Sequence, residues 1–382
     1  DKKEADLDTY NVKLGDNYFK AAYKLKLGYD DNVTNGATDA DRQEGAYMDN
    51  GVQIALYSPI APEFSFDTDF FFGYRTYLSG SDNDDNYIIK AGSGDTFAFN
   101  WDLNERTRIS LVDRLSVTMD DSVRGVTGNS DQHFLNNDLG VQLYRELGED
   151  SGYGVKIGQR TKSSLNDAYT FREYDETYFG ALFDMKAGQK LTISPFLNYE
   201  DREWEENQNA DGEKIQIGAA VKFELNEKIT LGGDIGVETV DFDNGTAQDN
   251  ASAEDSETGL FGSASIDHTV SEKLSHRAKL SYGRRMTSLA TVNFSRDITL
   301  DYTAKYQVSS KTKVGAGLNV YQSEDQSSQG EDYTIITPKA NLDFKISERM
   351  NLNLEYRYQD KSSDSDFEYD RSELSAELTY KF

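Results

Sequence analysis

The sequence has no cysteine, only four prolines among its 382 residues, and no long apolar run. The lack of cysteine excludes disulfide bonds, thiolate metal sites and thiol nucleophiles. A membrane-spanning helix needs about 18 or more consecutive apolar residues, so we expect no transmembrane helix. The chain is instead rich in tyrosine (24), phenylalanine (20) and glycine (30), a composition that argues against a disordered protein.

The overall charge and hydropathy, taken alone, suggest an acidic soluble protein. The net charge is −28, the isoelectric point is near 4.4 and the mean hydropathy is −0.71. A transmembrane β-strand, however, alternates lipid-facing apolar residues with lumen-facing polar ones, so its mean hydropathy is low. The last residues show this alternation, because Leu374, Ala376, Leu378, Tyr380 and Phe382 are apolar and the residues between them are polar. Low hydropathy is therefore what a membrane β-barrel predicts.

Alternating segments recur about every twenty residues, separated in turn by a tight turn and by a longer acidic loop. We count about eighteen such segments, an even number, as bacterial outer-membrane barrels require. The sequence thus predicts an all-β protein, a transmembrane antiparallel up-and-down β-barrel, in which residues 1–16 are a periplasmic segment and residues 17–382 form the barrel. Because the sequence starts at Asp1, we expect a mature, exported chain in the outer membrane of a Gram-negative-type bacterium.

Most of the negative charge is expected on the longer loops, which carry about 26 of the 28 net charges. We take these loops as extracellular, since tight turns such as 225–228 and 346–349 are typical of the periplasmic end. Acidic loops keep a protein soluble, or bridge divalent cations to anionic surface glycans; a loop-bound divalent cation is the one cofactor that this pattern suggests. The acidic loop positions are Asp82, Asp84, Asp85, Glu203, Glu205, Glu206, Asp241, Asp243, Glu254, Asp255, Glu324 and Asp325.

Strand parity also predicts which charged residues face the barrel lumen. Two interpretations are open: a water-filled wall of interleaved ion pairs, or a basic track along which an anionic polymer or solute slides. Parity gives the facing of a residue but not its height along the barrel, so it does not choose between them. The basic candidates for the pore lining are Lys24, Lys26, Arg108, Arg114, Lys156, Arg160, Arg277, Lys279, Arg285, Lys313, Lys339 and Arg357.

Catalytic motifs are scarce. The chain has three histidines, and His133 falls on an outward loop or at the start of the strand that follows it. His268 and His276 lie on two strands that flank one tight turn, where they could pair, but they have lipid-facing parity and no serine or carboxylate triad around them. No phosphate-binding glycine loop, metalloprotease helix or complete calcium loop occurs. We therefore do not expect an enzyme.

Two stretches carry a family resemblance. Residues 25–33, which end in Tyr29-Asp30-Asp31-Asn32-Val33, and the hairpin that ends at residues 70–75 resemble the β-barrel porin 2 family of outer-membrane proteins. The resemblance implies polymer export or surface organisation, often beside exopolysaccharide genes, and it assigns no catalytic residues. The chain resembles the alginate exporters only in strand number, since it shows no evident long plug or gating loop.

Two functions follow as hypotheses. The first is a porin-like outer-membrane channel that passes hydrophilic solutes or exports a surface polysaccharide through an aqueous lumen. The second is a structural barrel whose acidic loops anchor a surface layer, a glycan or a protein partner. In both, the chain contacts outer-membrane lipid and lipopolysaccharide, and neither involves nucleic acid.

Overall fold

The computed structural model describes residues 10, 12–33, 35–38, 42–79, 86–91, 95–119, 133–205, 210–242, 256–289, 292–326, 330–365 and 368–382. In this part of the chain the secondary structure is almost entirely β, with one short 3-10 helix, η2, at Asp167–Arg172. No helix in the described ranges is long and apolar enough to cross a membrane.

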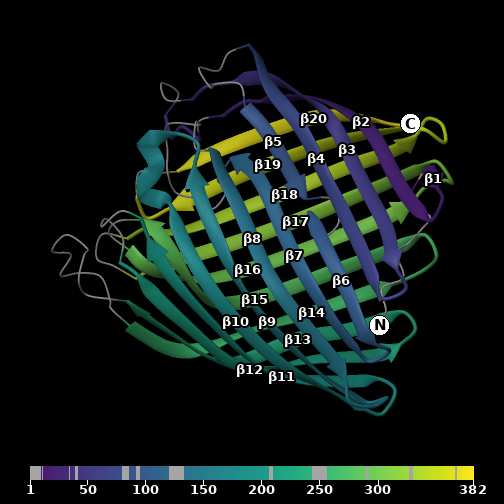
Figure 1. Ribbon diagram of the computed structural model, residues 1–382. Coiled ribbons are helices and arrows are strands. Elements are labelled where there is room, and N and C mark those ends of the chain that lie inside the picture. Colours follow the sequence, from purple (N-terminus) through teal and green to yellow (C-terminus); the bar gives the residue numbers. More distant parts are fainter. Residues whose placement is uncertain are drawn as a thin grey trace.

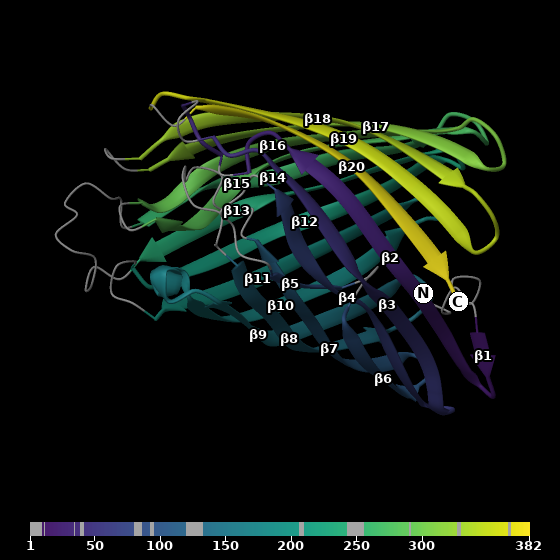
Figure 2. The same cartoon turned by 90° about the horizontal axis from the view of Figure 1, so that it is seen from above.

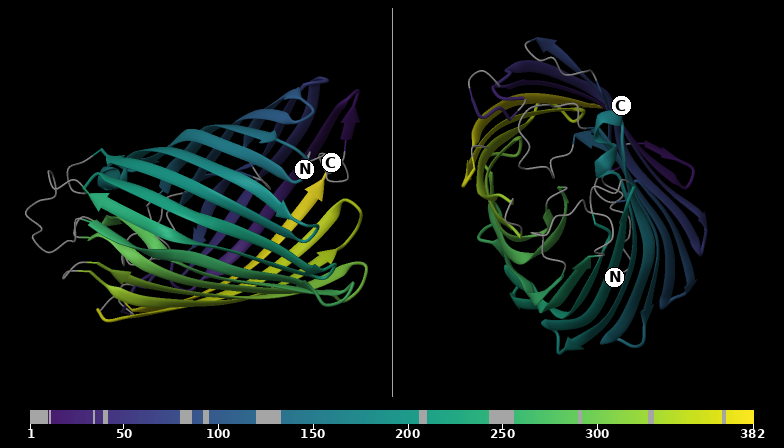
Figure 3. Two further views of the ribbon diagram at one scale, coloured as in Figure 1. Left: turned by 90° about the horizontal axis from the view of Figure 1, so that it is seen from below. Right: turned by 90° about the vertical axis from the view of Figure 1, so that its left-hand side faces the viewer.

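The strands form one closed antiparallel barrel in which nearly every strand pairs with its neighbours in sequence (Figures 1 and 2). The twenty strands of the described ranges make eighteen wall positions, because β1 lies outside the ring and β5 and β6 share one position. Viewed down its axis the ring is elongated (Figure 3). The strands are β1 Val12–Leu14, β2 Asn17–Asp30, β3 Gly45–Ala61, β4 Phe64–Ser79, β5 Asn86–Ala91, β6 Phe97–Asn104, β7 Thr107–Met119, β8 His133–Glu146, β9 Ser151–Ser164, β10 Tyr174–Ala187, β11 Leu191–Trp204, β12 Gly212–Asn226, β13 Ile229–Phe242, β14 Ser256–Thr269, β15 Leu274–Leu289, β16 Val292–Gln307, β17 Thr312–Asp325, β18 Asp332–Lys345, β19 Met350–Ser363 and β20 Tyr369–Lys381. The predicted all-β barrel with about eighteen strands is confirmed.

The outward faces of the strands form the apolar belt that the sequence predicts. Leu27, Leu111, Ile217, Ile235 and Leu260 are between 42% and 66% exposed, and they alternate with residues that face inward. Exposed apolar side chains around a closed ring are stable only against lipid, and closure leaves no unpaired strand edge in the hydrocarbon. In outer-membrane barrels the short turns are periplasmic and the longer loops extracellular, and we name the two ends accordingly.

The barrel closes by pairing β2 with β20, as the alternation of the last strand predicts. The ladder runs from Ala22 opposite Lys381 to Asp30 opposite Glu373. Below it, β1 pairs with the first residues of β2 through a tight turn at Gly15, whose φ of 62° suits glycine. The predicted role of residues 1–16 as a periplasmic segment stays a prediction.

One wall strand is interrupted, which the sequence did not reveal. β5 and β6 both pair with β4, but β5 meets β7 only at Ile89 opposite Val117. Beside the interruption, the hydroxyl of Thr96 takes the place of the missing backbone partners of Leu115. It accepts from the Leu115 N–H (2.9 Å) and donates to the Leu115 carbonyl (3.3 Å). β5 has only six residues, which is too short for alternation to predict it from sequence.

The extracellular tip of the β15–β16 hairpin folds into the lumen. The ladder between β14 and β15 ends at Gly262 opposite Tyr282, although β15 continues to Leu289. Above that point the backbone ladder with β14 is absent, and β15 contacts β13 and η2. Residues 286–289 and 292 therefore belong to an inward-folded hairpin and not to an outward loop, which longer acidic connections in the sequence would predict. This hairpin supplies the lumen with a filling element that the sequence did not suggest.

Candidate solute path through the barrel

Eight of the twelve predicted basic residues form cross-strand ion pairs on the inner face. Seven of the partners lie on the neighbouring strand, and the eighth, Asp95, lies just before β6, as in a wall of alternating charge. The pairs are Lys24–Glu377 (3.8 Å), Lys26–Glu373 (3.2 Å), Arg108–Asp102 (2.7 Å), Arg114–Asp95 (2.7 Å), Arg160–Glu176 (2.5 Å), Arg277–Asp267 (3.4 Å), Arg285–Asp297 (2.8 Å) and Arg357–Glu373 (2.7 Å). This arrangement favours an ion-paired wall over a continuous row of unpaired cations.

The other four basic candidates also lie on the inner face. Lys156 lies 5.8 Å from the ring centre of Tyr178. Lys279 and Lys313 stand directly across their ladders from Asp301 and Asp343. Lys339 is opposite Arg357, which is bonded to Glu373.

A large cavity of about 1340 Å³ occupies the periplasmic half of the lumen beside β2, β3, β4, β6 and β7. Its lining mixes lysines of β2 with aspartates of β3, β4 and β6, and it adds the aromatic side chains of Tyr57 and Phe71. Asp69 accepts a hydrogen bond from Gln53 (2.8 Å), and Asp102 holds Arg108 through two bonds of 2.7 and 3.0 Å. The surface is therefore polar and charged, with apolar rings set into it.

A smaller cavity of about 210 Å³ adjoins the first on its extracellular side. Lys26, Ile88 and Lys90 line both cavities, so they mark the level at which the two meet. Ile88 and Lys90 come from β5, so the interrupted strand contributes two of the three residues at this junction. Sequence reasoning missed Lys90, because β5 was not recognised as a strand.

Cations predominate in the smaller cavity. Its lining holds five basic side chains, Lys26, Arg75, Lys90, Arg357 and Arg371, and three carboxylates, Asp30, Glu355 and Glu373.

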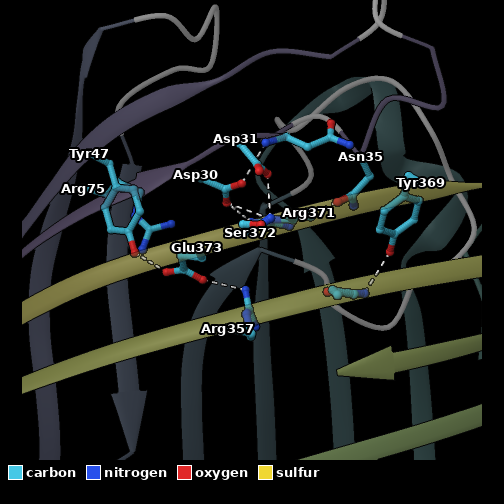
Figure 4. A network of polar contacts seen from close by, with 12 residues as sticks. Asp30, Asp31, Asn35, Tyr47, Arg75, Arg357, Tyr369, Arg371, Ser372 and Glu373 are labelled. Atoms are coloured by element: carbon cyan, nitrogen blue, oxygen red, sulfur yellow. Dashed lines mark hydrogen bonds and ion pairs between the residues drawn. The ribbon is translucent and has the colours of Figure 1, made fainter. Parts of the chain in front are cut away.

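The groups around this cavity are joined in a polar network (Figure 4). Glu373 accepts hydrogen bonds from Tyr47 and Arg357 and lies 3.2 Å from the ammonium of Lys26. The guanidinium of Arg75 stacks on Tyr47 at 4.1 Å and binds both oxygens of Asp49 at 2.6 and 2.8 Å. Bidentate and stacked guanidinium groups are held in one geometry, so these cations are pre-positioned.

The Asp30-Asp31-Asn32 motif forms the extracellular rim of this network and joins the first loop to the last strand. Arg371 of β20 donates to Asp30 (2.8 Å) and to Asn35 (3.2 Å), and the backbone N–H of Ser372 donates to Asp31 (2.6 Å). Asn32 is fully buried and bonds Gly36 and Asp370. The motif singled out by family resemblance is thus a structural clasp at the barrel seam.

The β15–β16 tip is held in the lumen by an apolar cluster. Met286 and Phe294 pack with Ala210, Val240 and Phe242, and the rings of Phe242 and Phe294 stack at 6.0 Å. By parity Met286 and Phe294 continue the lipid-facing sides of their strands. Because the tip bends inward, that face is buried against the inner wall of β13 instead.

Buried ion pairs accompany this cluster. Arg284 of the tip is 4% exposed and binds Glu238 (3.3 Å) and Glu257 (2.5 Å), and its backbone N–H also donates to Glu238 (2.7 Å). Glu238 further contacts Lys214 at 3.3 Å. On β11, Arg202 binds Glu176 at 2.6 Å and reaches the Met286 carbonyl at 3.4 Å.

The predicted acidic loop positions fall into three groups. Glu203, Asp241, Glu324 and Asp325 lie on the ends of β11, β13 and β17 rather than in loops, because the backbone ladders continue above the apolar belt. Glu205 directly follows β11. Asp82, Asp84, Asp85, Glu206, Asp243, Glu254 and Asp255 lie outside the described residues. Within the described ranges no group of three or more His, Cys, Asp or Glu side chains is arranged to hold a metal ion.

Among known structures, several bacterial porins share this fold. They include a BenF-like porin from Pseudomonas fluorescens Pf-5 (13% identity, 95% of this chain and 98% of that chain, TM-score 0.56) and Pseudomonas aeruginosa OpdK with vanillate (9%, 95% and 99%, TM-score 0.55). A third is Pseudomonas aeruginosa OccK2 (OpdF) in complex with glucuronate (13%, 95% and 98%, TM-score 0.54).

Sequence comparisons add nothing to this. No protein-family model matches the chain, so none supports the resemblance to the β-barrel porin 2 family, and no curated protein matches it. At these identities the structures establish the fold: the chain has the eighteen-strand barrel of outer-membrane porins.

Proposed function

We propose that this chain is an outer-membrane channel for small hydrophilic solutes, with a preference for solutes that carry a carboxylate. The observation that carries the proposal is the pair of adjoining cavities inside a closed membrane barrel, which meet at Lys26, Ile88 and Lys90. A passage whose upper chamber has a volume of about 210 Å³ fits a small solute better than an extended polymer.

The charge of the passage supports the carboxylate preference. Five cations and three carboxylates line the upper chamber, and a lumen ring with excess cations favours anions. Two proteins of the same fold are described with small carboxylates, vanillate and glucuronate. Export of a polysaccharide, which the family resemblance suggested, finds no support in these comparisons.

Single-channel recording in a planar bilayer tests the proposal. We expect a steady conductance that prefers anions and is reduced by millimolar glucuronate or vanillate. Lys26→Gln removes a charge at the junction, so it should lower the anion-to-cation permeability ratio and the block by glucuronate several-fold. Lys24→Gln is the matched control, because Lys24 lies two residues away on the same face of β2 but lines only the lower cavity.

The result also separates the two hypotheses. A folded protein without any conductance would contradict the channel and leave the second candidate, a barrel that anchors a surface partner through its acidic loops. Equal effects of Lys24→Gln and Lys26→Gln would contradict the junction while leaving the channel itself intact. Cation preference at about 1 M salt, where the Debye length is about 3 Å and distant loop charges are screened, would contradict the carboxylate preference.

A further inference from the structure

Two of the three histidines in the chain meet on the outer face of the barrel, at its periplasmic rim. His268 on β14 and His276 on β15 are directly opposite in the ladder, and Nδ1 of His268 lies 3.0 Å from Nε2 of His276. Their rings are perpendicular, with centres 4.9 Å apart. The turn that joins β14 to β15 follows immediately, so the pair is at the edge of the lipid belt, where water from the periplasm reaches it.

The spacing of the two nitrogens suits a shared transition-metal ion. Imidazole nitrogens bind such ions at about 2.0–2.1 Å, so two of them on one ion are separated by about 2.9–3.4 Å at right-angled or tetrahedral geometry. The observed 3.0 Å falls within this range. Cross-strand neighbours are also held at fixed separation by the backbone ladder, so a metal ion need not draw the strands together.

The second observation is that one nitrogen of the His276 ring makes no hydrogen bond. Its Nδ1 atom is shielded from solvent and has no hydrogen-bond partner among the described residues. Nothing therefore fixes the tautomer of this ring from the other side, and a rotation about its Cβ–Cγ bond breaks no further bond. The ladder neighbours of the pair on β13 and β16 are Ile229 and Ala304, which offer neither a competing charge nor a third ligand.

We propose that His268 and His276 form a two-histidine site for a divalent transition-metal ion, with Cu²⁺ bound most tightly and Zn²⁺ or Ni²⁺ less so. On binding, each neutral ring places its proton on the nitrogen that does not face the ion, and the two facing lone pairs take the metal in place of their mutual hydrogen bond. Water from the periplasm completes the coordination.

The site lies on the shortest ladder between two unbroken wall strands in the described barrel. β14 and β15 share eight residue pairs, whereas β13 and β14 share thirteen, because the β15–β16 tip leaves the wall above Gly262. A metal ion at the periplasmic end of this ladder cross-links the two strands where their pairing is least extensive. Metal binding then stabilises the folded barrel, because the ion binds the native pair better than separated strands.

Copper titration of the folded, detergent-solubilised chain without a histidine tag tests the site. We expect one Cu²⁺ per chain, with an electron paramagnetic resonance spectrum that shows two nitrogen ligands. His276→Gln and His268→Gln should each weaken binding at least tenfold. His133→Gln removes the remaining histidine, on the extracellular side, and should leave binding unchanged.

Thermal unfolding of the wild-type chain gives an independent readout if a histidine variant does not fold. Cu²⁺ or Zn²⁺ at micromolar concentration should raise the transition temperature, and EDTA should reverse the rise. The proposal is overturned if copper binds with oxygen ligands alone, if His268→Gln and His276→Gln bind as tightly as the wild type, or if metal leaves the wild-type transition unchanged.

Discussion

The extracellular and periplasmic halves of the inner wall follow the same alternating pattern, but the charged side chains beneath the β15–β16 tip are buried much more deeply than those of the β14–β15 ladder below it. In the upper half, the side chains of Glu176 and Glu238 are 0% exposed, each held by arginine or lysine. In the lower half, the paired side chains of Arg277 and Asp267 are 60% and 50% exposed. The difference arises because the β15–β16 tip covers Glu176 and Glu238, whereas Arg277 and Asp267 lie below the tip. An inward charge is thus part of a protein core in one half and of a water-filled surface in the other.

The largest difference between the halves is expected when a carboxylate is removed. Glu238→Ala removes a fully buried carboxylate that both Arg284 and Lys214 contact, which costs about 3–5 kcal/mol of unfolding free energy. The matched change in the lower half, Asp267→Ala, leaves Arg277 in water and costs about 0–1 kcal/mol. Denaturant unfolding, followed by the gel-mobility shift of the folded barrel, measures both. Equal losses would show that the upper wall is as hydrated as the lower.

The apolar cluster gives the second test. Phe294→Ala removes a fully buried ring and is expected to cost about 3 kcal/mol. It should also raise single-channel conductance, because the tip loses its packing against β13 and can move out of the lumen. Phe344→Ala is the control, since Phe344 lies on the lipid-facing side of β18 and is 39% exposed. An unchanged conductance in Phe294→Ala would mean that the tip does not restrict the lumen.

Cysteine accessibility sharpens the comparison residue by residue. In the lower wall, a membrane-impermeant thiol reagent should label Lys222→Cys and Asp301→Cys but not their sequence neighbours Val221→Cys and Leu300→Cys. Met286→Cys should resist the impermeant reagent and also a lipid-soluble one, because it is enclosed by protein. Labelling of Met286→Cys by the lipid-soluble reagent would show that this residue faces lipid, as strand parity alone predicts.

The smallest effect is expected at Asp325, on the inner side of β17 above the apolar belt. Burial raises the pKa of its carboxyl to about 6, although the backbone N–H of Glu331, which donates to this carboxyl at 3.2 Å, opposes the rise. The folded protein therefore holds this proton more tightly than the unfolded chain, so the stabilisation is full below pH 4 and is lost as the pH rises through about 6. Between pH 4 and pH 7, wild type should lose about 2 kcal/mol more stability than Asp325→Asn. Parallel curves of unfolding free energy against pH for the two proteins would refute the raised pKa of Asp325.

Much of the barrel could be predicted from sequence because a membrane strand exposes its apolar face to lipid. That rule places Leu300 outside and Asp301 inside without knowledge of any tertiary contact. It fails at Met286 and Phe294, because alternation is unchanged when a hairpin bends off the wall. The bend depends on the fit of these two side chains to Val240 and Phe242, which are about 50 residues away in sequence.

The candidate solute path was predicted only in part for a related reason. Parity identified Lys26 and Arg357 as inward-facing, but the meeting of the two cavities depends on height, which follows from strand register and tilt. Lys90 was missed because β5 has only six residues and meets β7 at a single pair, so its pattern is too brief to recognise. The pairing of His268 with His276 was foreseeable, since a tight turn fixes the register of its two strands.

The clasp at the barrel seam has a consequence for assembly. Asp30 and Arg371 are 341 positions apart, so the contact between them forms only after the whole chain has been made and the intervening hairpins are in place. Closing such a long segment has a large entropic cost and makes closure a late step. A seam shifted by two residues would still keep every apolar side chain in lipid, so the belt alone does not define where the ends join. The contacts of Asp30 and Asp31 with β20 form only in the correct register, so they favour the correct closure over the shifted one in the final step of folding.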